Sequence, residues 1–410
     1  MTDDVASPGV DDALSRLFRL EYGRAVATLV RLVGDIDSAQ EAVQEAFAVA
    51  VEQWPRTGLP PNPGGWIVTT ARRRAIDRLR REATRDARHV QATLLSGPSA
   101  DTEEEAVRDD QLRLIFTCCH PALAPAAQVA LTLRLVGGVD TSTIARAFLL
   151  PEATLAQRLV RAKRKIRDAG IPYRVPEEWE LPARLPSVMS VIYLIFNAGW
   201  SSSGDNLVDV ELCQEAIRLS RLLRRLMPDE PEAAGLLALL LLLHARQPAR
   251  TGPAGELVPL SEQNRHCWDG PMLAEGRELV RSCLRRGAPG PYQLQAAINA
   301  VHSDAASFQD TRWDEVLALY DQLLAWLPTP VVALNRAVVV AELDGPQAAL
   351  NLVRDIDLVS YQPFHAVRAE LLARAGAVEA ARAEYDRALD LTTARAEREH
   401  LTNRRAQLER

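Results

Sequence analysis

Apolar residues recur every three or four positions along the first part of the chain, which is the spacing of one face of an α-helix. A second run of this kind covers residues 36–54, and a third begins near Trp66 and continues to Arg88. Prolines and glycines between positions 55 and 65 separate these two runs. The pattern predicts a helical unit over residues 11–89. The apolar positions of the first run, which ends at Gly34, are Leu14, Leu17, Phe18, Ala25, Leu29, Leu32 and Val33.

Two further blocks follow the first. Residues 90–110 are small, polar and acidic, and they are predicted to form an exposed linker because they have little apolar surface to bury. The last turn of this segment can also start the next helix. A second, smaller helical unit is predicted over 111–173. The proline-rich stretch from Val175 to Pro186 is predicted to be a hinge, and residues 180–410 to form a third, larger helical block.

The end of the third block has weak repeat character. Small and apolar residues after His365 follow an order that resembles a tetratricopeptide repeat, in which small residues let paired helices pack closely. An earlier candidate, residues 334–353, matches less well and is out of register. The block is therefore interpreted as tetratricopeptide-like. The positions concerned are Ala369, Leu372, Gly376, Ala381, Tyr385, Ala388 and Leu389.

Composition agrees with helices throughout the chain. Of the 410 residues, 47% are hydrophobic and 5% are aromatic, and Ala, Leu, Arg and Glu dominate. This apolar content fills packed interiors and argues against wholesale disorder. The prediction is an all-α protein of two or three domains.

Nothing in the sequence indicates secretion or a membrane. The first residues lack the basic region and apolar stretch of a secretory signal. The longest apolar runs, 188–196 and 236–243, are too short to span a bilayer and are predicted to be buried helices. We expect a cytoplasmic protein with no membrane partner.

The five cysteines have no Cys-x-x-Cys spacing, so reduced thiols are expected rather than a disulfide framework. Cys118, Cys119 and His120 are adjacent, but neighbouring helical positions point about 100° apart and converge poorly on one ion. We predict no metal and no cofactor.

Basic residues are concentrated in two short segments, although the formal charge of the whole chain is −6. The second segment lies in a predicted helix-turn-helix over residues 140–167. Thr141 or Ser142 is expected to cap its short first helix, and Pro151 suits the start of its second helix. Early residues of such a second helix reach base edges in the major groove, and later ones meet phosphates. The residues expected to contact DNA are Thr154, Gln157, Arg158, Arg161, Lys163, Arg164 and Lys165.

The first basic segment is the predicted helix over residues 66–88, whose arginines cover much of its circumference. A tryptophan beside an arginine face is typical of single-stranded DNA binding. Trp66 fits that role, but it also fits a core aromatic that holds the helix in place, and both interpretations remain open. The arginines are Arg72, Arg73, Arg74, Arg78, Arg80, Arg81, Arg85 and Arg88.

Three motifs in this order make residues 11–172 resemble the extracytoplasmic-function sigma factors, of the sigma-70 family and sigma-24-like. DSAQEAVQEAF, from Asp37 to Phe47, is similar to the family's region 2 segment that docks on core RNA polymerase. WIVTTARRRAID, from Trp66 to Asp77, is similar to the segment that handles the −10 element. LLPEATLAQRLVRAKRKIR resembles the region 4 helix that reads the −35 element.

The resemblance implies a promoter-specificity subunit that is not an enzyme. Its partners would be promoter DNA and core RNA polymerase, through the β′ clamp helices and the β flap. Arg73 stands where the family commonly has Asn, and Pro151 where it commonly has Ser. The implied polymerase-binding residues are Asp37, Glu41, Gln44, Glu45 and Phe47. The implied −10 residues are Trp66, Arg72, Arg73, Arg74, Asp77, Arg80 and Arg81.

The third block resembles the C-terminal extension of one subgroup of these sigma factors, which is thought to replace a separate anti-sigma protein. This implies regulation in cis, through an intramolecular contact with the sigma domains. The extension would either support them in an active arrangement or mask them. The loops at 201–206 and 267–270 are the candidate contacts.

Two other classes of protein fit the sequence less well. An enzyme is disfavoured because Asp205, Asp209, His266 and Asp269 are accompanied by no phosphate-binding loop or His-x-x-x-His pattern. A stand-alone DNA-binding regulator, or a repeat-containing interaction protein, would leave the segment 37–47 without a role.

Overall fold

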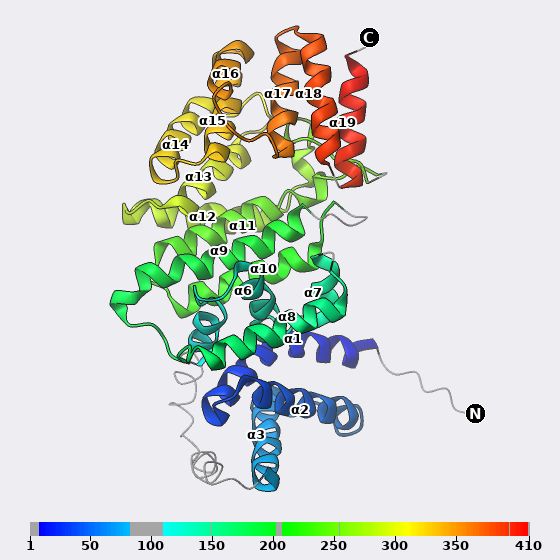
Figure 1. The fold of residues 1–410 in the computed structure, drawn as a ribbon, viewed down its shortest axis with the longest axis vertical. Coiled ribbons are helices and arrows are strands. Elements are labelled where there is room, and N and C mark those ends of the chain that lie inside the picture. Colours follow the sequence, from blue (N-terminus) through cyan, green and yellow to red (C-terminus); the bar gives the residue numbers. More distant parts are fainter. Residues whose placement is uncertain are drawn as a thin grey trace, which may run out of the picture. The chain divides into compact units, whose positions relative to one another are not determined.

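The structure, a computed structural model, describes residues 8–82, 110–148, 150–201, 207–253, 255–392 and 394–408. The described residues form helices and no strand, apart from an isolated bridge between Thr251 and Leu257. They divide into two compact units, residues 1–194 and 195–410 (Figure 1). The prediction of an all-α fold is confirmed.

Unit 1 begins with three helices that pack on one another: α1 (Pro8–Val33), α2 (Ile36–Thr57) and α3 (Pro63–Glu82). Asp35 caps α2 by accepting a hydrogen bond from the Ser38 amide at 2.8 Å. The predicted helices are confirmed, and α3 starts three residues before the expected Trp66.

An aromatic cluster holds α1 against α2. The ring centroids of Phe18 and Phe47 lie 4.6 Å apart, and Tyr22 lies beside both. Tyr22 is fully buried and Phe47 is 5% exposed, so these rings form the centre of the first block.

The second block of unit 1 contains a helical segment over 110–118, then α6 (Pro125–Leu131), a π-helical turn η1 (Thr132–Val136), α7 (Thr141–Ala147) and α8 (Glu152–Asp168). Here α1 packs directly on η1. A Cβ atom at Gly23 would lie 2.3 Å from the Val136 carbonyl oxygen, so only glycine allows this approach.

Asp110 corrects the predicted extent of the linker. Its carboxylate is fully buried and accepts hydrogen bonds from Arg31 on α1, at 2.9 Å, and from Arg113, at 3.1 Å. The Tyr173 hydroxyl also donates to the carbonyl oxygen of Ala27 on α1, at 2.7 Å. Asp110 therefore belongs to the packed interior, while residues 90–109 of the predicted linker lie outside the described residues.

The predicted hinge over 175–186 is also corrected. It contains a short turn, η2 (Glu178–Glu180), and the start of α9 (Leu181–Trp200), which has Pro186 inside it. Arg184 donates to the Phe116 carbonyl oxygen at 2.8 Å. Pro182 and Pro186 lie in α9, whose start is attached to the second block, and Pro176 precedes η2 outside a helix.

Unit 2 contains the end of α9 and a succession of helices in which each helix from α12 onward packs on the next (Figure 1). Short 3-10 turns η3 (Gln247–Ala249), η4 (Leu260–Glu262) and η5 (Arg265–Cys267) lie between α11 and α12. The helices are α10 (Val210–Leu226), α11 (Pro231–His244), α12 (Gly270–Arg286), α13 (Pro291–Asp304), α14 (Trp313–Trp326), α15 (Pro330–Leu343), α16 (Pro346–Val353), α17 (Gln362–Arg374), α18 (Val378–Leu391) and α19 (Arg395–Gln407).

The repeat-like segment forms a helical pair, α17 and α18, joined at Gly376 with φ of 79°. Ala369, Ala381 and Ala388 are fully buried between helices, as the spacing of small residues predicts. The pair has the packing expected of a repeat, and the name tetratricopeptide-like stays a prediction.

The two apolar runs lie inside helices. Residues 236–243 belong to α11, and all but Leu243 are buried. Residues 188–196 belong to α9, which is the one helix in the described part of the chain that is long and apolar enough to cross a membrane. Val188, Ile192 and Phe196 are buried within the protein, as expected for a core helix.

Candidate functional site

The helix-turn-helix predicted from the sequence consists of α7 and α8, which pack together. Asp140 caps α7, and not Thr141 or Ser142: its Oδ1 accepts from the Ser142 hydroxyl at 2.5 Å and from the Thr143 amide at 2.8 Å. Partial burial raises the pKa of Asp140, but these hydrogen bonds outweigh it and lower the pKa to about 2. The cap therefore stays charged at neutral pH.

Helix α8 has one buried stripe, formed by Leu155, Leu159, Ala162 and Ile166. Because these residues are three and four positions apart, they lie on one side of the helix. The side chains between them point away from that side or flank it. Five of the seven residues predicted to contact DNA are exposed there, and Thr154 is half-buried at their edge. The five are Gln157, Arg158, Arg161, Arg164 and Lys165.

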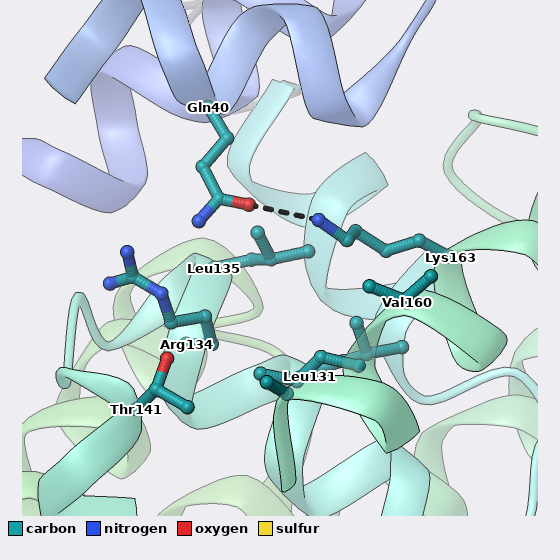
Figure 2. A pocket seen from close by; sticks show the side chains of 9 residues that line it. Gln40, Leu131, Arg134, Leu135, Thr141, Val160 and Lys163 are labelled. Carbon is teal, nitrogen blue, oxygen red and sulfur yellow. Dashed lines mark hydrogen bonds between the residues drawn. The ribbon is translucent and has the colours of Figure 1, made fainter. Parts of the chain in front are cut away.

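Lys163, the seventh predicted residue, is directed elsewhere. Its side chain is 14% exposed and forms an ion pair with Asp37 of α2. The Gln40 side chain lies between Lys163 and Arg134 (Figure 2), beside a pocket of about 190 Å³ at the junction of α2, η1 and α8. In this conformation Lys163 joins the two blocks of unit 1.

Three carboxylates stand four residues apart along α2: Asp37, Glu41 and Glu45. Lys163 pairs with the first. Arg78 of α3 donates to Glu41 at 2.5 Å and to Glu45 at 2.7 Å. The candidate polymerase-binding surface is therefore neutralised by cations of the same chain.

The remaining residues of that set lie in two different environments. Gln44 is exposed between the carboxylates. Phe47 is buried in the aromatic cluster, so it can support a partner only by holding α2 in place.

Helix α3 brings together several of the predicted −10 residues. Arg73, Arg74 and Asp77 are exposed, and Arg72 is half-buried. Trp66 is half-buried and meets Trp54 of α2 edge to face, with 5.2 Å between ring centroids. Trp66 thus serves the core and keeps part of its surface accessible. The side chains of Arg80 and Arg81 lie outside the described residues.

The residues considered for an enzyme have structural roles. Asp209 caps α10 through the Leu212 amide at 3.0 Å, and Asp269 caps α12 through the Met272 amide at 2.9 Å. His266 is exposed in η5, and Asp205 lies outside the described residues.

Cys118 and Cys119 are both buried, and Cys119 Sγ lies 3.4 Å from the Thr132 hydroxyl. Burial raises the pKa of Cys119 to about 12 and also raises the pKa of Cys118. Neutral thiols are poor metal ligands. Among the described residues no group of three or more His, Cys, Asp or Glu side chains is placed to hold an ion.

Comparison with known proteins agrees with this geometry. Residues 17–85 match the family described as Sigma-70 region 2, and residues 113–166 match Sigma-70, region 4. Residues 184–284 match a family of unknown function, DUF6596. No solved structure matches the chain.

The chain also has relatives in several bacteria. It is 43% identical over 381 residues to the uncharacterized protein R00370 of Rhizobium meliloti, covering 90% of each chain. It is 28% identical over 165 residues to the probable ECF RNA polymerase sigma factor SigI of Mycobacterium tuberculosis, covering 39% of this chain and 56% of SigI. It is 25% identical over 164 residues to the ECF RNA polymerase sigma factor SigK of Mycolicibacterium vanbaalenii, covering 38% of this chain and 81% of SigK.

Regions 2 and 4, with a helix-turn-helix in the second block, define a transcription initiation factor of the sigma-70 class. More narrowly, the chain belongs to the extracytoplasmic-function sigma factors, and its C-terminal extension contains the DUF6596 region. It acts with core RNA polymerase on promoter DNA and is not an enzyme.

Proposed function

We propose that the exposed face of α8 reads the −35 element of the promoter as duplex DNA. The observation that carries this assignment is the separation of α8 into a buried apolar stripe and a polar face that bears Gln157, Arg158 and Arg161. Arg and Gln side chains recognise base edges in the major groove by paired hydrogen bonds. Arg164 and Lys165 lie further along the same helix, where phosphate contacts are expected.

For the −10 element we propose α3. Trp66 keeps an accessible edge near its start, and Arg73 and Arg74 are exposed further along. In this family an unstacked base of the melted strand is captured, which costs a few kcal/mol of unpairing. Exposed arginines offset part of that cost by neutralising phosphates. Arg73 replaces a residue that is commonly Asn, so we expect a base preference different from that of its relatives.

For core polymerase we propose two contacts: α2 with the β′ clamp helices, and region 4 with the β flap. Asp37, Glu41 and Gln44 supply the exposed part of the α2 surface. Polymerase binding then exchanges one set of cations for another, because Lys163 and Arg78 occupy these carboxylates in the free chain.

The extension is proposed to regulate the sigma domains in cis, either by supporting them or by masking them. Its size and continuous helical packing support a stable domain with a role of its own. A cytoplasmic location follows from the proposed partners.

The test is run-off transcription with core RNA polymerase and a genomic promoter library. The full chain should give promoter-dependent transcripts, and Arg158→Ala should reduce them at least ~5-fold, since one lost bidentate contact costs about 1–3 kcal/mol. The matched control is Arg285→Ala, an exposed arginine of α12 that should leave transcription unchanged.

A chain ending after Tyr173 provides a further arm of this assay. More transcription than the full chain indicates masking, and less indicates support. Unchanged transcription would contradict both forms of cis regulation. If neither chain bound core polymerase, the polymerase contacts proposed here would be wrong.

A further inference from the structure

Three arginines of unit 2 come from separate segments that the fold brings together, because η3 contacts η5 and both Arg246 and Arg265 donate to α13. Arg246 follows α11, Arg250 follows η3, and Arg265 belongs to η5. Burial, and then repulsion from Arg250 and Arg265, lowers the pKa of Arg246 to about 10. Burial likewise lowers the pKa of Arg250 to about 10. At neutral pH all three remain charged, in a part of the protein where positive charge is poorly solvated.

Neutral groups hold these guanidinium groups in position. Arg246 donates to Asn299 Oδ1 at 3.1 Å. Arg265 donates to the carbonyl oxygens of His302 and Ala305 at the end of α13, and its guanidinium lies 4.9 Å from the Trp268 ring centroid. Arg250 lies over the Trp200 ring at 4.2 Å.

The nearby carboxylates influence these arginines without pairing with them directly. Glu397 acts on Arg250, and Asp310 acts on Arg265, as the electrostatic influences on their pKa values show. No carboxylate of the described residues forms an ion pair with any of the three arginines. Within the described residues, three arginines are thus opposed by two carboxylates that act at longer range than an ion pair.

Hydrogen-bond donors are also left without acceptors. Arg250 Nη1, Arg265 Nη2 and Trp268 Nε1 are buried and have no partner in the described structure. His302 Nδ1 is in the same state, and burial, together with Arg246 and Arg265, lowers the pKa of His302 to about 4. Native proteins satisfy nearly all buried polar groups, so several orphan donors around one cationic cluster call for an acceptor.

Another buried charge in the same unit shows the usual solution. Glu384 of α18 is 3% exposed. Its carboxylate is hydrogen-bonded to His365 Nδ1 at 2.6 Å and accepts a hydrogen bond from Arg387 Nη1 at 2.7 Å. The fold thus pairs that charge with groups of its own. The three arginines differ because no carboxylate of the described residues forms an ion pair with them, while each side chain remains partly accessible to solvent.

We propose that Arg246, Arg250 and Arg265 form a binding site for a small oxyanion, the phosphoryl or carboxylate group of a small molecule. Guanidinium groups match both oxyanions by paired hydrogen bonds, and the orphan donors supply additional ones. The site rests on unit 2 alone and is independent of the DNA and polymerase contacts. It would give the extension a chemical input.

The test uses the full chain with inorganic phosphate and succinate as probes, and sodium chloride at matched ionic strength as the reference. Binding is measured by calorimetry and by the shift in the thermal unfolding of unit 2. We expect saturable binding of at least one probe. Phosphate alone would identify a phosphoryl ligand, and succinate alone a carboxylate ligand.

Variants separate a binding site from a structural role. Arg246→Gln and Arg250→Met should weaken binding at least ~10-fold, since one charge-assisted pair is lost. Arg281→Gln, on the exposed face of α12, is the matched control and should bind as the parent chain does.

Two outcomes would overturn the proposal: the absence of saturable binding for both probes, or equal binding by Arg250→Met. Promoter-dependent transcription by Arg246→Gln without added anion is measured in parallel. Transcripts there, with or without anion binding, show that the sigma assignment stands separately from the oxyanion site.

Discussion

The two basic helices of unit 1 use their arginines in different ways. On α3, Arg78 is 21% exposed and is fixed between Glu41 and Glu45 of α2. On α8, Arg158 and Arg161 are exposed and make no ion pair among the described residues. The same side chain thus stabilises the fold in one helix and is presented to a partner in the other. A basic segment in a sequence does not by itself distinguish these uses.

The largest expected effect comes from removing the structural arginine of α3. Arg78→Met should lower the local stability of α2 and α3 by about 1–2 kcal/mol, because two carboxylates lose a half-buried partner. Amide hydrogen exchange of these helices should accelerate accordingly. Arg73→Met, at an exposed position of the same helix, should change exchange by less than about 0.5 kcal/mol. Equal effects of the two variants would remove the distinction between them.

An intermediate effect is expected at the N-terminal cap of α7, the helix that packs against α8. Asp140→Ala should destabilise the α7–α8 pair by about 1 kcal/mol at pH 7. The pKa of Asp140 is lowered in the folded chain to about 2, from an ordinary value of 3.8. Its contribution is therefore complete above about pH 4 and is lost as the pH falls toward 2.

The pH dependence of that cap is checked by comparing the parent chain with Asp140→Ala. The difference in α7–α8 exchange protection should be constant from pH 7 to about 5 and should shrink below about 4. Asp390→Ala, an exposed aspartate of α18, is the control. A difference that grew on acidification would contradict the assigned hydrogen bonds.

The smallest effect distinguishes two lysines of α8. Lys165→Met should reduce the salt dependence of −35 duplex binding by about 0.9 in the slope of log K against log salt, the value of one phosphate contact. Lys163→Met should leave the slope unchanged, since Lys163 faces Asp37. Fluorescence anisotropy at several salt concentrations measures both. If Lys163→Met also reduced the slope of log K against log salt, Lys163 would contact DNA and the assignment made here would be wrong.

Sequence periodicity was sufficient for the helices of unit 1 and for the face of α8, because both depend on local spacing. It was not sufficient for Asp110 and Arg78, whose roles depend on partners 79 and 37 positions away. Asp110 lies beside an acidic run, and its local sequence resembles a linker. The cap at Asp140 could have been predicted from the sequence, because Asp is a favoured N-cap residue and stands one position before Thr141.

The prolines of 175–186 misled for a physical reason. Pro182 stands in the first turn of α9, where no amide donor is needed. Pro186 lies further inside α9, where it removes one backbone hydrogen bond without ending the helix. The arginine cluster of unit 2 had no sequence signal, because its members are dispersed and only the fold brings them together.

The ion pair between Lys163 and Asp37 affects how core polymerase and −35 DNA influence each other's binding to this chain. Any partner that takes Asp37 must release Lys163, and any partner that draws Lys163 away leaves Asp37 open. In the free chain Lys163 makes no phosphate contact, but polymerase that takes Asp37 releases it for one. Polymerase and −35 DNA would then show positive cooperativity, and reciprocity requires each to raise the affinity for the other by the same factor. A partly exposed ion pair of up to about 1 kcal/mol limits that factor to roughly fivefold.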